Sequence, residues 1–448
     1  MASHSSSDKI AVYGPVPSDR RATGSVRVPG SKSITQRYFC LALLGAGGLE
    51  VRDPLLSDDT RFFLAAMETL GFEVEVEEGR RPRVRLKPGP KVGSPDNSGD
   101  IWCGAGGTMF RFLTAALTAV PGRWRIDGIP RLRERPVGPL IDSLRQLGAR
   151  IDCEEHEGHA PLLAHGGSLQ GGRCTLDAGA SSQYLSAVLM AALTAPQPVT
   201  VEALALTSEP YVDLTVDAIR AMGGEVEKND NIYKVRRARP TGDTVQIEAD
   251  FSSVAYPAAA AALTGGDVMI EGAGADSRQG DRGFIDVLER MGVTVQWTDE
   301  GLRVRGDQLH GDQLKGGQLQ GIDADLESMP DQVPTLAALA PFAEGVTRIT
   351  NVPNLRIKES DRLAAMTEEL RRAGAEVEEL ADGLIIPGVW AKDDPPTEPV
   401  TVKTHGDHRI AMAMALVGLR RPGLSLAEPD VVAKSYPDFW RDLEELIA

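Results

Sequence analysis

Basic side chains stand at or near the openings of helices that the sequence predicts to be buried, and this placement indicates a site for anions. They are Lys32, Arg37, Arg111, Arg135, Lys358, Arg362, His408, Arg409 and Lys434. A helix N-terminus already presents unpaired N–H groups and a positive dipole end, so a further cation there does not stabilise the helix. The same end attracts phosphate and carboxylate groups. We therefore expect these cations to hold an anionic ligand.

Small polar residues accompany some of these cations and favour the same interpretation. The turn Gly106-Gly107-Thr108 lets backbone N–H groups approach a phosphate or carboxylate closely, because glycine has no side chain. Structural alternatives exist: Arg133-Glu134-Arg135 and the segment from Lys358 to Arg362 are also typical of ion-paired turns, and Ser181-Ser182 of a helix N-cap. The recurrence of cations at one point of several repeats favours a ligand site.

Two other motifs carry less weight. The segment from Gly24 to Ser33 resembles a nucleotide phosphate loop only superficially, because Ser31 separates Gly30 from Lys32. A second group lies within a short stretch of strand-edge sequence but does not have the ligand spacing of a tetrahedral metal site. Its members are Cys153, His156, His159 and His165. The sequence therefore disfavours a nucleotide kinase and predicts no metal.

Length and charge narrow the class of protein. The chain has 448 residues, which predicts two or three domains with sizeable cores. Its net charge of −16 disfavours nucleic acid or an acidic membrane as a partner, and no stretch has the length and apolarity of a membrane span. Residues Met1 to Asp8 lack the layout of a secretory signal, and the four cysteines have no disulfide or zinc spacing. We expect a cytoplasmic protein with buried, reduced thiols.

A repeat runs along the chain in which an amphipathic helix ends at a glycine and a short alternating strand follows. The glycines are spaced about 70 to 80 residues apart, which indicates an internal repeat. They are Gly71, Gly148, Gly223, Gly292 and Gly374.

A second signature alternates with the first: a polar or glycine-rich turn opens a helix of small apolar residues. The openings are Ser31-Lys32-Ser33, Gly106-Gly107-Thr108, Ser181-Ser182-Gln183, Ser252-Ser253, Pro330-Asp331 and Asp407-His408-Arg409. Helices with few charges are buried on most sides, so we expect one interior and one outer helix in each of six units, forming two similar lobes. The final unit closes on a helix from Trp440 to Leu446, and Gly306 to Gln320 is expected to be a hairpin extension or loose connector.

Several ordered motifs together resemble the 5-enolpyruvylshikimate-3-phosphate synthase (3-phosphoshikimate 1-carboxyvinyltransferase) family over essentially the whole chain. The matching stretches are Pro29 to Ser33 with Arg37, Gly106 to Thr108 with Arg111, Arg133 to Pro136, Ser181 to Gln183, Ser208 with Pro210-Tyr211, Pro330-Asp331, Asn354 to Glu359 with Asp361-Arg362, Asp407 to Arg409, and Ala433 to Ser435. The resemblance implies an α/β protein: a two-lobed inside-out α/β barrel with six repeated βαβαββ-type units, three per lobe. It implies one lobe from residues 31–247 and another from 1–30 plus 248–448, with the active site in the cleft between them.

The implied reaction joins phosphoenolpyruvate to the 5-hydroxyl of shikimate 3-phosphate and releases phosphate, without a cofactor. The resemblance assigns shikimate 3-phosphate to Lys32, Ser33, Arg37, Ser181, Ser182, Gln183, Ser208, Tyr211, Asp331, Asn354 and Lys358. It assigns phosphoenolpyruvate to Lys32, Gly107, Arg135, Gln183, Arg362, His408, Arg409 and Lys434. Two such substrates need about this many cations in a poorly hydrated cleft.

The same resemblance supplies the catalytic roles. The chemistry needs a base for the hydroxyl and an acid for the methylene carbon. Asp331 is expected to be the base, assisted by Lys32, and Glu359 the proton donor, while Lys434 aids phosphate departure. Closure of the lobes is expected, with hinges near Ser31 and Ile247.

Two alternatives differ from this expectation at named residues. A related enolpyruvyl transferase that acts on UDP-N-acetylglucosamine typically has Lys-Asn in place of Lys32-Ser33 and a cysteine in the loop that here spans residues 131–136 without one. A silent metabolite-binding protein would lack Asp331, Glu359 or Lys434, and all three are present.

Two residues depart from the family's usual pattern. Ala105 stands where many members have Asn, and Phe112 stands where Pro is frequent, which affects the expected sensitivity to inhibitors. Gly107 leaves room beside phosphoenolpyruvate, so glyphosate is expected to compete with that substrate. We expect a monomer.

Overall fold

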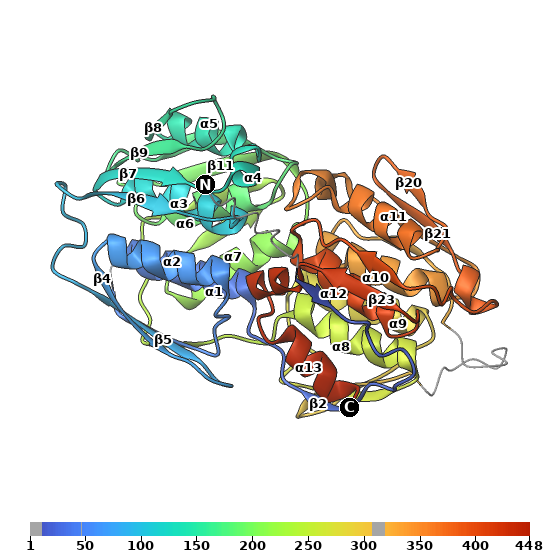
Figure 1. The fold of residues 1–448 in the computed structure, drawn as a ribbon. Coiled ribbons are helices and arrows are strands. Elements are labelled where there is room, and N and C mark those ends of the chain that lie inside the picture. The colour runs from blue at the N-terminus through green and yellow to red at the C-terminus, as the bar shows by residue number, and fades with distance from the viewer. Residues whose placement is uncertain (1–10, 46, 307–318) are drawn as a thin grey trace, which may run out of the picture.

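The computed structural model describes residues 11–45, 47–306 and 319–448. The amino-terminal segment Met1 to Asp8 and most of the expected connector from Gly306 to Gln320 lie outside these residues. Helices alternate with short strands along the rest of the chain, so the protein belongs to the mixed α/β class (Figure 1).

Six open sheets account for the strands of the described residues, and none of these sheets closes into a barrel. Five have four strands, with one parallel and two antiparallel pairs. The first has the spatial order β14 (Thr244–Gln246), β3 (Leu49–Arg52), β5 (Arg83–Pro88), β4 (Phe72–Glu77), and the second has β6 (Ser98–Trp102), β7 (Gly122–Asp127), β9 (Leu162–Gly166), β8 (Arg150–Cys153). The third has β10 (Gly172–Ala178), β11 (Val199–Leu206), β13 (Ile232–Val235), β12 (Val226–Asn229), and the fourth has β16 (Thr294–Trp297), β17 (Gly301–Arg305), β15 (Asp267–Glu271), β2 (Thr23–Val26). The fifth has β18 (Asp323–Asp325), β19 (Val346–Thr350), β21 (Gly383–Pro387), β20 (Glu378–Leu380). The sixth sheet has the order β1 (Val12–Tyr13), β23 (Leu424–Ala427), β22 (Val400–Val402).

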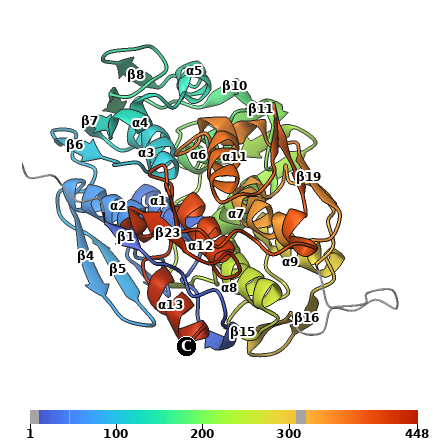
Figure 2. The same cartoon turned by 45° about the vertical axis from the view of Figure 1, so that its right-hand side comes forward.

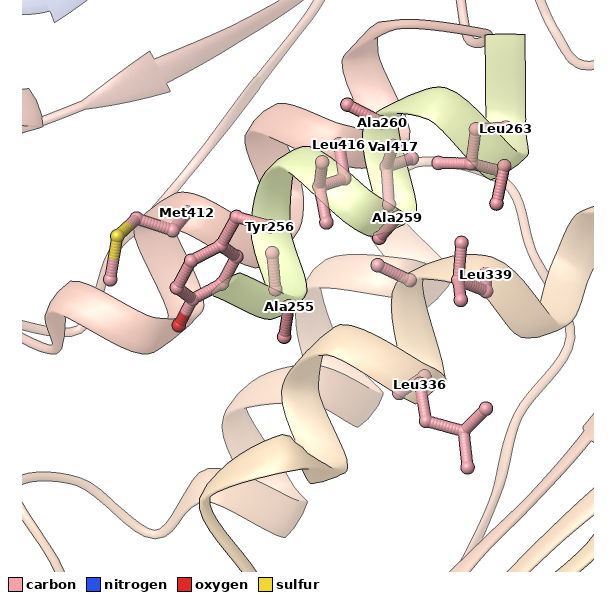
Figure 3. Close-up of a cluster of buried hydrophobic side chains, with 14 of the residues drawn as sticks. Ala255, Tyr256, Ala259, Ala260, Leu263, Leu336, Leu339, Met412, Leu416 and Val417 are labelled. Atoms are coloured by element: carbon pink, nitrogen blue, oxygen red, sulfur yellow. The ribbon is translucent and has the colours of Figure 1, made fainter. Parts of the chain in front are cut away.

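The helices with small apolar residues are the interior ones, as the sequence predicts. They are α1 (Lys32–Gly45), α3 (Gly107–Ala119), α6 (Gln183–Ala192), α8 (Phe251–Thr264), α10 (Val333–Leu339) and α12 (His408–Gly418). Every residue of α8 is buried, because alanines let neighbouring helices approach it closely. Figure 3 shows Ala255 and Ala259 of α8 beside Leu336 and Leu339 of α10.

The more polar helices lie outside the interior ones. They are α2 (Asp58–Thr69), α5 (Gly138–Gln146), α7 (Pro210–Ala221), α9 (Gly283–Arg290), α11 (Arg362–Arg372) and α13 (Phe439–Leu446), and a short helix α4 (Pro130–Arg133) precedes α5. The repeated glycines end five of them as predicted, with positive φ angles of 97°, 85°, 80°, 97° and 98° in chain order. Residues with a β-carbon rarely adopt this conformation, so glycine here stops each helix and directs the chain into the next strand.

The apolar side chains form two separate clusters. One is built from residues between Phe39 and Ile247, and the other from Val16 to Val28 together with Phe251 to Ile447. Figure 1 shows the elements from α1 to α7 on one side and those from α8 to α13 on the other, and in the turned view of Figure 2 the two groups partly overlap.

The chain passes between the two clusters at two adjacent places. Strand β2, before the first crossing, pairs with β15, after the second, whereas β14 and β3 pair within the segment between the crossings. The two crossing segments are bonded together: the Ser31 amide donates to the Glu248 carbonyl at 2.9 Å, and the Asp250 amide donates to the Pro29 carbonyl at 2.9 Å. Gly30 is required there because a β-carbon would meet the Asp53 carbonyl oxygen.

None of the helices in the described residues combines the length and apolarity needed to cross a membrane.

Candidate active site

A cleft between the two apolar clusters receives the N-terminal ends of all the interior helices named above. Lys32 and Ser33 come from α1, Gly107 from α3, and Gln183 from α6. The facing wall holds Ser252 of α8, the turn Pro330–Gln332 that leads into α10, and the opening of α12. Six helix dipoles therefore point their positive ends at one space, as the positions of the cations in the sequence predict.

Most of the residues expected from the sequence line this cleft. Those that do are Lys32, Ser33, Gly107, Arg135, Ser181, Ser182, Gln183, Ser208, Tyr211, Asp331, Asn354, Lys358, Glu359, Arg362, His408 and Arg409.

Arg362 is the centre of the charge network, although its side chain is only 2% exposed. Its Nε donates to Asp407 Oδ2 at 2.8 Å, its Nη1 to Asp331 Oδ1 at 2.8 Å, and its Nη2 to Glu359 Oε2 at 2.9 Å. A buried guanidinium needs such partners, because its desolvation is otherwise very unfavourable. These carboxylates fix its fork in one orientation.

A second arginine shares the same carboxylates. Arg409 Nη2 donates to Asp331 Oδ2 at 2.8 Å, and the Arg409 amide donates to Asp407 Oδ1 at 3.0 Å. Asp331 thus bridges two arginines with its two oxygens, and Asp407 caps α12 while it pairs with Arg362.

Glu359 joins the network to the opposite wall. Lys434 Nζ donates to Glu359 Oε1 at 2.8 Å and to the Ala105 carbonyl at 3.1 Å, so it links the two clusters. Arg135 Nη1 lies 3.7 Å from the same carboxylate oxygen, which is too long for a hydrogen bond. Since the Ala105 contact uses only the backbone, it does not depend on the side chain at that position.

The two carboxyl groups are held in their charged form. Burial alone raises the pKa of Asp331, but Arg409 and Arg362 outweigh burial and lower this pKa well below its usual range. Burial likewise raises the pKa of Glu359, and Lys434, Arg362 and Arg135 together lower it far more. Both groups are therefore carboxylates at neutral pH in the ligand-free protein.

Burial disfavours the charged form of the nearby basic groups as well, so it lowers their pKa values. Burial, with Arg362 and Arg135 nearby, lowers the pKa of Lys358 to about 8, although Asp331 opposes the change. Burial and the charge of Lys32 lower the pKa of His408 well below its usual value, so its imidazole is neutral at pH 7. Burial and neighbouring cations therefore reduce the positive charge that Lys358 and His408 carry.

Several buried donor atoms in the described residues have no hydrogen-bond partner. In and beside the cleft they are Arg135 Nε and Nη1, Arg409 Nε, Arg111 Nε and both ring nitrogens of His408; the others belong to Gln36, Tyr233, Tyr256, Thr335 and Thr347. An unpaired buried donor costs about 1 to 3 kcal/mol, more when charged, and native proteins leave few of them. Those of Arg135, Arg409 and His408 belong to residues that line the cleft, where an anionic ligand can complete their bonding.

Other residues of the lining carry hydroxyl and amide groups. Gln183 Nε2 donates to Thr108 Oγ1 at 2.9 Å, while its Oε1 accepts from Arg111 Nη1 at 2.5 Å. Ser208 Oγ donates to the Glu327 carbonyl at 3.0 Å across the cleft. Such groups suit a ligand that carries several hydroxyls beside its charges.

Arg37 differs from its expected role. It is buried, and its guanidinium donates to the Ser33 carbonyl, the Thr215 hydroxyl and the Tyr211 carbonyl, all at 2.6 to 2.7 Å. It therefore ties α1 to α7 and does not line the cleft. The Phe112 ring, 5.4 Å from the Arg37 guanidinium carbon, also lies outside the lining. Lys434 also does not line the cleft, although its Nζ donates to the Glu359 carboxylate, which does.

The lining also contains residues that the sequence did not single out as site residues. They are Asp59, Thr108, Thr207, Asp250, Ser252 and Pro330. Thr108, Ser252 and Pro330 belong to helix openings that the sequence does identify. Asp250 caps α8 by accepting from the Ser252 amide at 2.9 Å. An aspartate shortly before Ser252-Ser253 is a typical N-cap residue, so the sequence contains a signal for this position. Asp59 had no such signal, because it stands within the first turn of an outer helix and lies 3.5 Å from Lys32.

The cysteine and histidine residues between Cys153 and His165 do not form a metal site in the part of the chain that the structure describes. The one group there with suitable spacing is Glu368, Glu369 and His405. Glu369 already accepts from Arg372 Nε at 2.9 Å and from the Lys403 amide at 3.0 Å, so ion pairing explains its position.

The chain matches proteins of known activity along almost its full length. Residues 17–443 match the family model for EPSP synthase (3-phosphoshikimate 1-carboxyvinyltransferase). A 3-phosphoshikimate 1-carboxyvinyltransferase of Syntrophobacter fumaroxidans is 45% identical over 425 residues, covering 94% of this chain and 96% of that protein. One from Pseudoalteromonas translucida is 39% identical, with 94% and 96% covered. A solved structure of EPSP synthase from Acinetobacter baumannii superposes with a TM-score of 0.76 at 27% identity, covering 96% of this chain and 97% of that one.

Removing the charge of Asp407 is expected to destabilise the fold. Asp407→Asn keeps the size of the side chain and an oxygen for the helix cap, but it leaves Arg362 with too little negative charge around it. We expect a loss of roughly 3 to 5 kcal/mol in the free energy of unfolding, measured by urea denaturation. Asp361→Asn is the matched control, because Asp361 caps α11 and pairs with the partly exposed Arg356. The control should lose less than about 1 kcal/mol, and equal losses would contradict a special role for the buried pair.

Proposed function

Because the chain belongs to the EPSP synthase (3-phosphoshikimate 1-carboxyvinyltransferase) family, its reaction is the transfer of an enolpyruvyl group from phosphoenolpyruvate to the 5-hydroxyl of shikimate 3-phosphate, and we propose how the cleft divides this work. The observation that carries the assignment of residues is the group of unpartnered buried donors beside two carboxylates. Donors bind the anions, and the carboxylates move protons.

Phosphoenolpyruvate binds at the end of the cleft where the cations gather. Its phosphate and carboxylate take up the free hydrogen-bonding capacity of Arg135 and Arg409, and Lys434 and Arg362 complete the set. Gly107 permits a close approach there: a β-carbon at this position would lie 2.6 Å from Arg135 Nη1. Lys32, Gln183 and His408 face the same space.

Shikimate 3-phosphate binds along the hydroxyl-lined end. Its binding residues in this proposal are Lys32, Ser33, Ser181, Ser182, Gln183, Ser208, Tyr211, Asn354 and Lys358. Asn354 has an unpartnered buried Oδ1 that is free to accept from a ligand hydroxyl. Arg37 supports this end indirectly by holding Ser33 and Tyr211 through their carbonyls.

Asp331 acts as the base toward the 5-hydroxyl, because it is ionised in the ligand-free cleft. Loss of that proton lets the oxygen attack the phosphate-bearing carbon of phosphoenolpyruvate, while the methylene carbon gains a proton to give a tetrahedral intermediate. Expulsion of phosphate with loss of a methyl proton then restores the double bond. The base must reach the 5-hydroxyl and the acid must reach the methylene carbon, and both carboxyl groups lie beside the guanidinium of Arg362.

Glu359 is the proton donor in this proposal, and the substrate itself prepares it for the role. In the free protein, Lys434, Arg362 and Arg135 hold its pKa low against the effect of burial. When a phosphate and a carboxylate pair with those cations, the opposing effect of burial dominates and favours the protonated acid. Binding of phosphoenolpyruvate therefore loads the donor with its proton.

The two apolar clusters act as two lobes of three units each, an inside-out arrangement in which residues 31–247 form one lobe and 1–30 plus 248–448 the other. Contacts across the cleft support closure onto the ligands. Arg131 Nη2 donates to the Lys358 carbonyl at 3.0 Å, and its Nε lies 3.2 Å from the carbonyl of Glu359. The bonded crossing segments at Ser31 and Asp250 are the place for a hinge.

One chain supplies both walls of the cleft, which supports a monomeric enzyme. The absence of disulfides among the four cysteines, all within the described residues, supports a cytoplasmic location.

The reaction is tested by phosphate release from phosphoenolpyruvate in the presence of shikimate 3-phosphate, UDP-N-acetylglucosamine or neither. We expect release only with shikimate 3-phosphate, and Asp331→Asn is expected to lower kcat by roughly 10² to 10⁴-fold, the range for loss of a general base. Asp323→Asn, an exposed aspartate on the preceding strand β18, should retain full activity. Release with the nucleotide sugar would assign the chain to the related transferase activity, and no release with either would leave a binding protein.

The charge of Lys358 predicts a pH dependence. Its pKa of about 8 means that the free protein loses this positive charge as the pH rises through that value. The ratio kcat/KM for shikimate 3-phosphate reports on the free enzyme, so it should fall about tenfold per pH unit above the pKa. Lys358→Arg keeps its charge in this range and should give a flat profile between pH 8 and 9, even if its activity is lower. Parallel declines in the two proteins would contradict the assignment.

Glyphosate carries a phosphonate and a carboxylate, so it is expected to occupy the cations assigned to phosphoenolpyruvate. The KM for phosphoenolpyruvate should rise in proportion to glyphosate concentration at saturating shikimate 3-phosphate, with kcat unchanged. Steady-state phosphate release measures both constants, and a KM that stays constant at high glyphosate would show that the two compounds do not share a site.

A further inference from the structure

Asp281 is a buried carboxyl group that has no part in the reaction proposed above. It lies in the short turn Gly280–Arg282 before α9, and its side chain reaches the wall of the other lobe. It is 2% exposed and does not line the cleft. A buried carboxylate is unfavourable unless its oxygens accept hydrogen bonds, so the partners of Asp281 show what it holds.

Two donors from different elements meet this carboxyl. The Tyr211 hydroxyl donates to Asp281 Oδ2 at 2.5 Å, and Gln332 Nε2 donates to Asp281 Oδ1 at 2.9 Å. Tyr211 belongs to α7 of one lobe and lines the cleft beside Ser208. Gln332 directly follows Asp331 in the other lobe and is fully buried. One carboxyl group therefore connects a substrate-facing hydroxyl with the turn that carries the proposed base.

The turn that carries Asp281 also packs closely against the segments of Tyr211 and Asp331. A β-carbon on Gly280 would lie 2.6 Å from the Ser328 carbonyl oxygen and 3.1 Å from Pro210 Cβ. Pro210 begins α7, directly before Tyr211, and Ser328 leads into the turn with Asp331. The same three segments therefore meet at the backbone and through the side chain of Asp281.

Tyr211 can present its hydroxyl to a ligand in only one way while this bond exists. Burial, with the charges of Asp281 and Asp331, raises the pKa of Tyr211 well above its usual value, so the hydroxyl keeps its proton. That proton points at Asp281, and the oxygen lone pairs are left for a donor in the cleft.

We infer that Asp281 is a positioning residue for shikimate 3-phosphate, which orients the Tyr211 hydroxyl toward the substrate and joins it through Gln332 to the turn of Asp331. The inference rests on the proposed function, since it assigns a role within the same site. It predicts that the bond, and not the negative charge, is what substrate binding requires.

The charged surroundings of Asp281 agree with this distinction. Burial and the neighbouring Asp331 raise the pKa of Asp281 to about 6, and Arg409 and the Tyr211 bond oppose the change. Asp250 also raises it. An uncharged acceptor of the same shape can therefore replace the carboxylate without leaving a cation unpaired, because neither of its hydrogen-bond partners is charged.

Two substitutions with equal charge test the inference. Asp281→Asn keeps an oxygen for the Tyr211 hydroxyl, and when the Gln332 amide turns over, the new amide group donates to Gln332 Oε1, which has no partner in the structure. Asp281→Ala removes both acceptors. We expect Asp281→Ala to raise the KM for shikimate 3-phosphate about tenfold, the scale of one or two lost hydrogen bonds, and Asp281→Asn to stay within about threefold of wild type. The KM for phosphoenolpyruvate should change less than about twofold in both, because the effect acts through Tyr211.

The Tyr211→Phe background separates positioning from a general loss of structure. If Asp281 acts through the hydroxyl, adding Asp281→Ala to Tyr211→Phe should change the KM for shikimate 3-phosphate by less than about twofold. Asp286→Ala, on the exposed face of α9, is the control and should leave both KM values unchanged. Thermal melts of each variant, and calorimetric binding of shikimate 3-phosphate, accompany the kinetics.

Three results would overturn the inference: equal KM increases in Asp281→Ala and Asp281→Asn, a full additional increase in the Tyr211→Phe background, or a lower melting temperature with no change in KM. Wild-type turnover with shikimate 3-phosphate is measured first. If the wild type turns over and Asp281→Ala has unchanged KM values, only the role of Asp281 is contradicted. If the wild type does not turn over, the proposed function is contradicted. In that event calorimetry still compares the variants for binding.

Discussion

The buried guanidinium of Arg362 is the interaction on which the arrangement of the cleft depends. Its three donor nitrogens are bonded to Asp331, Glu359 and Asp407, and each carboxylate comes from a different turn at a helix opening. Removing an arginine from water is so unfavourable that all three turns must be in place for the folded state to contain it. The fold thus brings distant parts of the chain together at one charge, and the same bonds place the proposed base, Asp331, beside the proposed acid, Glu359.

The interior helices make this convergence possible. Because α8, α10 and α12 consist largely of small apolar residues, they pack against one another without pushing their ends apart (Figure 3). Their aligned N-termini would repel the arginines if no anion were present. The carboxylates compensate for that repulsion in the free protein, and anionic ligands are able to compensate for it in the complex. The positive potential of the cleft is therefore only partly balanced by carboxylates in the free protein. Donors of Arg135 and Arg409 remain unpartnered because a ligand is needed to balance the rest.

Local sequence signals predict local features of this molecule well. The glycines that end the outer helices and the polar openings of the interior helices were both identifiable, because each reflects a backbone or dipole requirement of a few consecutive residues. Packing between distant segments is what the sequence could not supply. The pairing of β14 with β3 joins residues 194 apart in the chain (Thr244 with Glu50), and that of β2 with β15 joins residues 244 apart (Thr23 with Asp267). Arg37 has the type and position of a phosphate ligand, yet nearby carbonyls occupy its donors. Asp59 lies beside Lys32 of another helix, and Asp281 accepts from Tyr211 across the boundary between the two apolar clusters, so neither environment is visible in the neighbouring sequence.

The balance of charges in the cleft links ligand binding to proton transfer. Without ligands, cations hold both Asp331 and Glu359 ionised, although burial favours the neutral acids. The two groups differ in what surrounds them. The cations that lower the pKa of Glu359 most, Lys434, Arg362 and Arg135, all belong to the set proposed for phosphoenolpyruvate. Asp331 is held by Arg409 and Arg362 of that set but also by Lys358, which the proposal assigns to shikimate 3-phosphate. Bound phosphoenolpyruvate therefore withdraws more support from Glu359 than from Asp331. In the proposed mechanism the same binding event therefore separates the two carboxyl groups into an acid and a base, although both begin as carboxylates.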